Sequence, residues 1–576
     1  MDRALTAATS SAGPNAVAVE NGERQPLLGS KLTAQQRDRE IVPRGEDEEE
    51  GAEDRQHVEG GEEEWKLPRH FVWIQFGIMS NVFLSGFDGT ITASTYAVIS
   101  SEFGATNTAS WLTTSYLVTN TAFQPLYGRV SDIFGRRICF FVATVAFALG
   151  CLGCSLSNDI ILLYCMRALT GFGGGGLMTM ATIINSDMIP FRNRGMYQAL
   201  QNSTYGLGAI CGASLGGSIA DSIGWRWCFL LQVPMSAFAL FLGYTVIKNP
   251  SHSLIGSSNG GQWTWLDAYK KVDISGSLLL VTGISIQLLG LSLGGNELPW
   301  SSPWVVGSLV GSVIILVTFL IVEVTTKAVP IIPFRLLRGK VPIATQISNA
   351  CVGLAVYGYI FMLPLFFQVV LLDSATKAGV RLVIPSIATP IGGVISGVVM
   401  SRWGKLPTLV RTGCFLMAVG IGLVASLSFV DSHWKYFTYI FVPNLGQGIV
   451  YPGLLFTSLA TFEHSEHAAT TSTVYLIRSL GTVWGVSVTS AIVQTTLNLR
   501  LPDALDGVPD KWKIIDAVRH SVEELRNLPP DVQLKARLVY YDGFRYSFIA
   551  SSAVASVALV SAFFINGKNL RTTVRK

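Results

Sequence analysis

The sequence carries few charged residues for its length. Asp, Glu, Lys and Arg make up 14% of the 576 residues, whereas 49% are hydrophobic, and the net charge is only +4. Soluble domains usually contain about 25% charged residues. The low charge content therefore argues against a soluble protein, and the small net charge argues against a nucleic-acid partner.

The cysteines are not spaced as they are in metal-binding sites. All eight lie in or beside hydrophobic segments, which is typical of small apolar packing residues. The sequence shows no arrangement of nucleophile and base and no set of metal ligands, so we expect no enzyme activity, no cofactor and no metal. The first 69 residues are too polar and acidic for a signal peptide, and we expect them to form a disordered cytosolic tail.

Long hydrophobic runs, by contrast, are abundant. Crossing the hydrocarbon core requires about 20 apolar residues. By this criterion the sequence predicts an all-α polytopic membrane protein with roughly fourteen transmembrane helices. The expected spans are 71–99, 109–128, 138–156, 160–184, 196–219, 226–247, 273–293, 304–325, 344–367, 378–400, 408–429, 436–460, 472–493 and 544–566.

Lys and Arg are nearly absent from alternate connections between these spans. The loops "SSEFGATN", "SLSND" and "GGNELPWSSP" contain neither residue. Because basic residues concentrate in cytosolic loops, we expect both termini in the cytosol. Lys377 and Arg381 are exceptions on the far side. The basic residues of the expected cytosolic connections are Arg129, Arg136, Arg137, Arg192, Arg194, Lys248, Lys270, Lys271, Arg335, Arg338, Lys340, Arg402, Lys405 and Arg411.

Two connections share a pattern. "GRVSDIFGRR" (128–137) and "GVVMSRWGKL" (397–406) both have Gly first, Gly eighth and a basic residue ninth. Transporters often show such weak internal repeats.

The expected organisation is an acidic tail (1–69), a six-helix bundle (70–248), a linker with two extra helices (249–326), a second six-helix bundle (327–566) with a non-cytosolic loop (494–543), and a basic cytosolic tail (567–576). Within that loop "IIDAVRHSVEELRNL" (514–528) has the spacing of a short amphipathic helix that caps the last helices.

The first of these patterns also has a physical reading. Gly128 and Gly135 allow close approach around a tight turn, and Asp132 can bond Arg129, Arg136 and Arg137. The pattern resembles the loop signature of the major facilitator superfamily. This resemblance implies the major facilitator fold and a cytosolic gating role for these six residues.

Other segments extend the resemblance over nearly the whole chain after residue 70. "YCMRALTGFGGGG" (164–176) is similar to the fourth-helix motif of proton-coupled members, with Arg167 in the matching place. "ATTSTVYLIRSLGTVWGV" (469–486) and "FDGTITAS" resemble the fourteen-helix drug:proton antiporter branch, and within it the fungal vacuolar basic amino acid transporters. "GAICGASLGG" resembles the fifth-helix antiporter motif, although Ala213 stands where the family usually has Pro; its matching residues are Gly208, Gly212, Gly216 and Gly217.

Asp88 lies in the middle of an apolar run, where an ionised acid is expensive. It is about 11 residues, or roughly 16 Å, from the non-cytosolic end of its helix, and Arg167 is about 7 residues, or roughly 10 Å, from the same side. We therefore expect Asp88 and Arg167 to meet and to couple transport to protons. A purely structural ion pair is the alternative.

Polar residues inside the other spans are candidates for the substrate cavity, although helix rotation is not fixed by the sequence. In the tail, "ERQPLL" resembles an acidic dileucine signal through Glu23, Leu27 and Leu28, which implies a sorting adaptor as partner. The cavity candidates are Asn120, Gln201, Asn202, Tyr357, Asn444, Gln447, Tyr451, Tyr475 and Arg478.

Taken together, the resemblance implies a monomeric, proton-coupled antiporter of small solutes. We expect it to move basic amino acids into the vacuole, in whose membrane it would reside. A multidrug:proton exporter of the plasma membrane is the nearest alternative. A membrane sensor that binds a solute without moving it is an alternative of another class, which the absence of a folded cytosolic domain disfavours.

Overall fold

The computed structural model describes residues 70–566, except for 104–110, 248–271, 295–297, 327, 329, 333–334, 336–337, 374, 464–465 and 521. The acidic and basic tails, and with them Glu23, Leu27 and Leu28, lie outside the described residues. The predictions made for them stay predictions.

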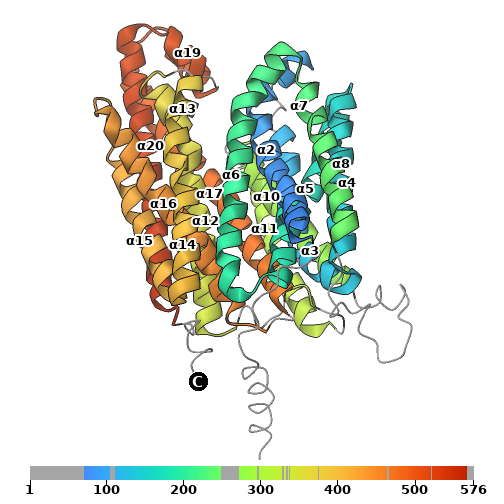
Figure 1. Ribbon diagram of the computed structural model, residues 1–576. Helices are drawn as coiled ribbons and strands as arrows, with labels where there is room; N and C mark the ends of the chain where they lie inside the picture. The colour runs from blue at the N-terminus through green and yellow to red at the C-terminus, as the bar shows by residue number, and fades with distance from the viewer. Residues whose placement is uncertain are drawn as a thin grey trace, which may run out of the picture. The chain divides into compact units, whose positions relative to one another are not determined.

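The named elements of the described part are all helices (Figure 1). The first set, which we call the first bundle, is α2 (Phe71–Glu102), α3 (Trp111–Phe134), α4 (Arg136–Leu156), α5 (Ile160–Met188), α6 (Phe191–Ser222), α7 (Arg226–Leu230) and α8 (Gln232–Val246). Two linker helices follow, α10 (Ile274–Leu293) and α11 (Pro303–Thr325). The second bundle is α12 (Lys340–Val369), α13 (Ala375–Ser386), α14 (Ala388–Trp403), α15 (Leu406–Ala425), α16 (His433–Leu459), α17 (His467–Ala504), α18 (Lys511–His520), α19 (Val522–Asn527) and α20 (Pro530–Phe563).

Every expected span overlaps one helix or a pair of helices. Two spans are broken, at Leu231 and at Ile387, and prolines, which cannot donate a backbone hydrogen bond, lie within three residues of each break. Ten of the described helical segments are long and apolar enough to cross a membrane by length and composition. α2, α3, α6 and α16 are not among them, because hydroxyl, amide and glycine residues interrupt their apolar runs. The total of fourteen stays a prediction.

Each bundle is held together by pairwise helix packing. In the first bundle α2 packs on α6 and α8, and α5 packs on both α3 and α4. In the second bundle α12 packs on α17 and α20, and α15 packs on α16 and α20. The linker helices α10 and α11 pack on each other, and α10 also packs on α3. The two bundles meet where α6 packs on α14 and α3 packs on α17.

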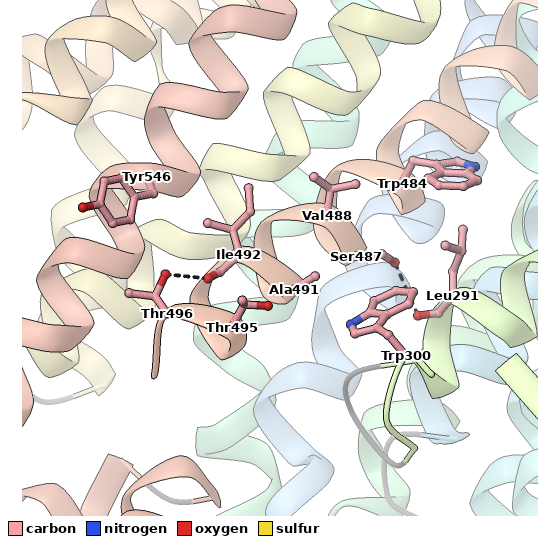
Figure 2. A pocket seen from close by; sticks show the side chains of 10 residues that line it. All are labelled: Leu291, Trp300, Trp484, Ser487, Val488, Ala491, Ile492, Thr495, Thr496 and Tyr546. Carbon is pink, nitrogen blue, oxygen red and sulfur yellow. Dashed lines mark hydrogen bonds between the residues drawn. The ribbon is translucent and has the colours of Figure 1, made fainter. Parts of the chain in front are cut away.

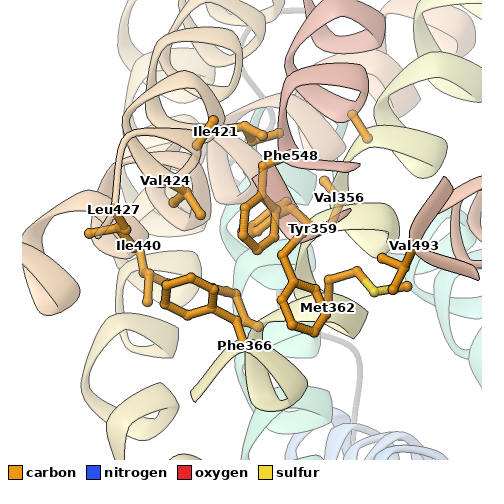
Figure 3. Close-up of a cluster of buried hydrophobic side chains, with 14 of the residues drawn as sticks. Val356, Tyr359, Met362, Phe366, Ile421, Val424, Leu427, Ile440, Val493 and Phe548 are labelled. Atoms are coloured by element: carbon orange, nitrogen blue, oxygen red, sulfur yellow. The ribbon is translucent and has the colours of Figure 1, made fainter. Parts of the chain in front are cut away.

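The largest apolar core lies in the second bundle (Figure 3). Phe366 of α12 packs edge-to-face on Phe548 of α20, with ring centroids 6.1 Å apart. Ile421 of α15 and Ile440 of α16 belong to the same core. Four helices therefore share one aromatic and aliphatic centre, and this core fixes how they pack.

The long loop after α17 is mostly helical. The expected amphipathic helix at 514–528 consists of two shorter helices, α18 and α19, and Ile515, Val518 and Leu525 are buried in the core of the second bundle. The helix that contains most of the expected span 544–566 is α20, which begins earlier, at Pro530. Tyr540 of α20 donates a hydrogen bond to the Val518 carbonyl. The segment therefore packs on the second bundle through its apolar residues.

The two basic exceptions to the loop-charge pattern have an acidic partner. Asp373, in the α12–α13 connection, forms ion pairs with Lys377 at 2.7 Å and Arg381 at 2.6 Å, and its side chain is 3% exposed. Its backbone carbonyl accepts a hydrogen bond from Arg526, and His433 contacts Arg381. Burial raises the pKa of Asp373, but hydrogen bonds from Lys377 and Arg381 outweigh it, so the pKa lies below its usual value.

We expect Asp373→Asn to lower the stability of the protein by roughly 1.5–3 kcal/mol, the range for hydrogen bonds to charged groups. Because the folded-state pKa is depressed, the difference from wild type should be full above about pH 3.9, the ordinary Asp value, and shrink as the pH falls through the folded pKa. Thermal unfolding of both proteins between neutral and strongly acidic pH tests this. A difference already lost near pH 6 would contradict it.

Candidate functional site

Asp88 and Arg167 meet inside the first bundle. Nη1 of Arg167 lies 2.9 Å from both carboxylate oxygens of Asp88. The side chains are 0% and 1% exposed, respectively. Breaking a buried ion pair by removing one partner typically costs 3–5 kcal/mol, because an unpaired charge is left behind. The pair therefore ties α2 firmly to α5.

Neighbouring helices hold the pair in place. Nε of Arg167 donates to the Leu112 carbonyl of α3 at 3.2 Å, and the guanidinium lies 4.5 Å from the ring centroid of Tyr116. From α8, Gln232 donates to Oδ1 of Asp88 at 3.3 Å. Four helices thus contribute to one charge pair. Because the side chain of Asp88 is fully buried, it is not exposed between the two bundles in this conformation.

The motif 128–137 forms a network at the turn from α3 to α4. Gly135 has φ 94°, a backbone conformation that favours glycine. Asp132 pairs with Arg136 at 2.7 Å and with Arg129 at 3.5 Å, and Arg136 also reaches Asp187 of α5 at 2.8 Å. In the repeat, the eighth residue Gly404 likewise has positive φ, 62°.

This turn also contacts the second bundle and the connection that leads into it. A Cβ on Gly128 would lie 1.9 Å from Oγ of Ser472, so α3 and α17 approach closely there. Arg129 donates to the carbonyl of Pro330, in the connection from α11 to α12, at 2.7 Å. Arg137 instead donates to the Tyr244 carbonyl at the end of α8. Residues of the motif therefore contact α17, α5, α8 and the connection from α11 to α12.

Glycines of α6 line its contact with α2. A Cβ on Gly208 would lie 2.2 Å from the Phe83 carbonyl oxygen, and one on Gly212 would lie 2.3 Å from that of Phe87. Gly216 is buried, and its carbonyl accepts a hydrogen bond from Cys228. Gly217 has no atom within 4 Å of its Cβ position, because it follows Gly216 by about 100° around the helix. Of the four expected glycines, Gly208 and Gly212 therefore make close contact with α2, and Gly217 does not.

The cavity candidates of the first bundle form hydrogen bonds within the protein. Gln201 is 0% exposed and donates to Thr182 at 2.7 Å, so it does not line an open cavity. Asn202 accepts from Gln198. On α3, Asn120 bonds both Tyr116 and Gln124.

The cavity candidates of the second bundle differ in how far their side chains are exposed. Asn444 is buried and accepts from Tyr359 at 2.8 Å, which places it inside the bundle. Gln447 is half-buried, and Tyr357 is 37% exposed. Tyr451 and Tyr475 surround Arg478, whose guanidinium carbon lies 4.1 Å and 5.6 Å from their ring centroids.

Polar contacts join the bundles near these residues. The hydroxyls of Thr182 and Tyr475 lie 2.9 Å apart, and Gln198 also donates to Tyr475. Ser479 donates to Gln124 at 2.9 Å. Tyr475 lies eight residues from the start of α17, or about 12 Å along it. These contacts hold the predicted cytosolic halves of the two bundles together.

A separate pocket of about 490 Å³ lies between α17, α20 and the linker (Figure 2). Trp300 and Trp484 line it together with Val488, Ile492 and Tyr546, and none of its ten lining residues is charged. Ser487 donates a long hydrogen bond to the Leu291 carbonyl at its wall. This apolar pocket does not include any of the predicted site residues.

Sequence reasoning missed several residues of the site. Gln232, Asn349 and Thr182 contact the predicted residues directly. The amides of Gln232 and Asn349 stand inside apolar runs, which was a usable signal. Nothing in the sequence marked Thr182, because threonine is common in transmembrane helices.

Comparisons with known proteins agree with the fold. The family model described as "Major Facilitator Superfamily" matches residues 78–486. The "Vacuolar basic amino acid transporter 2" of Saccharomyces cerevisiae is 43% identical over 78% of this chain and 96% of its own length. The "Multidrug resistance protein fnx1" of Schizosaccharomyces pombe is 36% identical over 85% of this chain and 92% of its own length. The proton:xylose symporter XylE has a similar structure, with TM-score 0.55 and 16% identity over 86% of this chain and 96% of its own.

We expect Gly212→Ala to destabilise the protein by about 1–3 kcal/mol, the usual range for overpacking, because the new methyl would clash with the Phe87 carbonyl. Gly217→Ala on the same helix is the matched control and should be neutral or slightly stabilising, since its Cβ position is open. Thermal unfolding of the purified variants measures both. Equal effects of the two changes would contradict the packing described.

We expect Arg167→Gln to destabilise the fold by about 3–5 kcal/mol, because Asp88 would stay buried without its counter-charge. The double variant Asp88→Asn, Arg167→Gln should lose clearly less than the sum of the two single variants. Unfolding measurements on all four proteins complete the cycle. Additive losses would mean that the two side chains do not interact energetically.

Proposed function

Because the chain belongs to the Major Facilitator Superfamily, and so is a membrane transporter rather than an enzyme, we propose that it exchanges protons for basic amino acids and moves them from the cytosol into the vacuole. The observation that carries the proton coupling is the sealed pair of Asp88 and Arg167. An ionisable pair at membrane depth is costly and usually serves transport. The vacuolar amino acid transporter among the relatives supports the substrate and the membrane.

The pair couples protons through its hydrogen bonds. A proton taken up by Asp88 cancels the negative charge that holds Arg167, so the attraction between α2 and α5 weakens. Release of the proton restores both 2.9 Å contacts. Gln232 and Tyr116 keep Arg167 and Asp88 in register while the charge changes. The protonation state of Asp88 thereby selects between two packings of the first bundle.

The contacts at the turn from α3 to α4 are the second element that must change during transport. Contacts of Gly128 with Ser472, and of Thr182 with Tyr475, close one half of the interface between the bundles. Transport requires these contacts to open while the opposite half closes. The basic residues Arg129, Arg136 and Arg137 lie on the same side, and the loop-charge rule supports a cytosolic location for that side and for both termini.

The localisation proposal includes the tail. We infer that Glu23, Leu27 and Leu28 bind a sorting adaptor that directs a monomeric transporter to the vacuolar membrane. The spacing in "ERQPLL" supports this part.

A multidrug:proton exporter of the plasma membrane is the second candidate. The relative named as a multidrug resistance protein favours it, and so does the aromatic lining around Tyr357 and Tyr451, because aromatic rings accept varied cations. Both candidates use the same proton site. They differ in substrate and membrane, so assays of lysine and of a cationic dye separate them.

We expect Asp88→Asn to abolish accumulation of lysine driven by a pH gradient, because the amide cannot carry the coupled proton. Uptake of radiolabelled lysine into proteoliposomes, beside a dye assay, measures this. The double variant Asp88→Asn, Arg167→Gln removes the unpaired charge and should fold, yet still fail to accumulate substrate.

Asp373→Asn is the matched control, since it also removes an Arg-paired carboxylate, but one outside the membrane-spanning helices. It should retain gradient-driven uptake. Accumulation against a gradient by either Asp88 variant would refute the proton-carrier role. A wild-type protein that moves the dye but not lysine would favour the exporter.

A further inference from the structure

Arg478 is a cation at membrane depth in the second bundle. It lies eleven residues after the start of α17, or about 16 Å along the helix. Its side chain is half-buried. The ring of Tyr451 lies against the guanidinium, with 4.1 Å between Cζ and the ring centroid, and the ring of Tyr475 lies at 5.6 Å. The side chain is therefore fixed between two aromatic rings near the interface of the bundles.

Unlike Arg167, Arg478 has no ion pair with a carboxylate of the described residues. Charged side chains within membrane spans usually pair with one another or with backbone carbonyls, and they mark the pathways of substrates and ions. The two aromatic contacts and the hydrogen bonds reduce the cost of the positive charge but do not neutralise it. A positive charge without a carboxylate partner among the described residues favours the binding of an anionic group from a ligand.

The guanidinium also has unused donors. Nε donates to Oδ1 of Asn349 at 3.1 Å, and Nη2 donates to the Tyr451 carbonyl at 3.4 Å. Asn349 is itself held by the Val474 carbonyl at 2.7 Å. An arginine has five N–H donors, so three are left, including both on Nη1. This fork suits the two oxygens of a carboxylate.

We propose that Arg478 binds the α-carboxylate of the transported amino acid. This inference rests on the proposed function and adds the chemical group by which the substrate is recognised. The exposed ring of Tyr357 is then available for the cationic part of the substrate. Asp88 is sealed behind Arg167 and takes no part in substrate binding in this conformation.

Lysine, lysinamide and cadaverine test the proposal. Lysinamide keeps the shape of lysine without the negative charge, and cadaverine lacks the carboxylate entirely. Calorimetric titration of the purified full-length protein with each compound gives three affinities. Wild type should bind lysine roughly 10- to 100-fold more tightly than either analogue, which is the value of hydrogen bonds between charged groups.

Arg478→Gln should lose this preference, with lysine bound as weakly as cadaverine and cadaverine bound as in wild type. A merely structural role would weaken all three compounds together. Arg478→Lys keeps the charge without the fork and should restore part of the preference, which also covers the case in which the Gln variant does not fold. Arg500→Gln is the matched control on the same helix, because Arg500 forms an exposed ion pair with Asp542.

Two results would overturn the inference while leaving the proposed function intact. The first is wild-type protein that binds cadaverine and lysinamide as tightly as lysine. The second is an Arg478→Gln variant that still prefers lysine. Wild-type protein that binds none of the three compounds would instead overturn the proposed function, and this inference with it.

Discussion

A charge inside a membrane must find a partner, and this constraint organises the first bundle. Asp88 and Arg167 neutralise each other with essentially no exposed surface. Their contact requires α2 and α5 to be adjacent and α3 to supply a carbonyl and an aromatic ring. Because an unpaired charge there is costly, packings of these helices that separate the two side chains are disfavoured.

Close helix approach makes that contact available. A Cβ on Gly171, one turn after Arg167, would lie 2.3 Å from the Tyr116 carbonyl oxygen, and one on Gly173 would lie 2.4 Å from the Phe147 nitrogen. α5 is therefore pressed between α3 and α4. The run "GFGGGG" serves packing on two faces at once, and the same closeness places Tyr116 over the Arg167 guanidinium. Glycine packing and charge pairing are thus parts of one arrangement.

Much of the helix layout could be predicted from the sequence, because span length and hydropathy follow from the bilayer thickness. The approach of Asp88 to Arg167 was also foreseeable, since the rise per residue gives the depth of each side chain. Rotation about the helix axis was not, and this is why Gln201 and Asn444 face their own bundle rather than a cavity. The neighbouring helices decide the rotation of each helix about its axis. The pattern of polar residues along one helix does not determine which of its faces packs against a neighbour.

Arg167 and Arg478 show how one residue type takes two roles. Both lie beside tyrosine rings within membrane-spanning helices. Arg167 has its negative partner, Asp88, in the same chain, so its charge is balanced as long as Asp88 is ionised. Arg478 has amide and carbonyl partners, which orient the guanidinium without cancelling its charge. Since α17 also carries Tyr475 and Ser479, which contact the first bundle, a ligand that neutralised Arg478 would act on the very helix that joins the two halves.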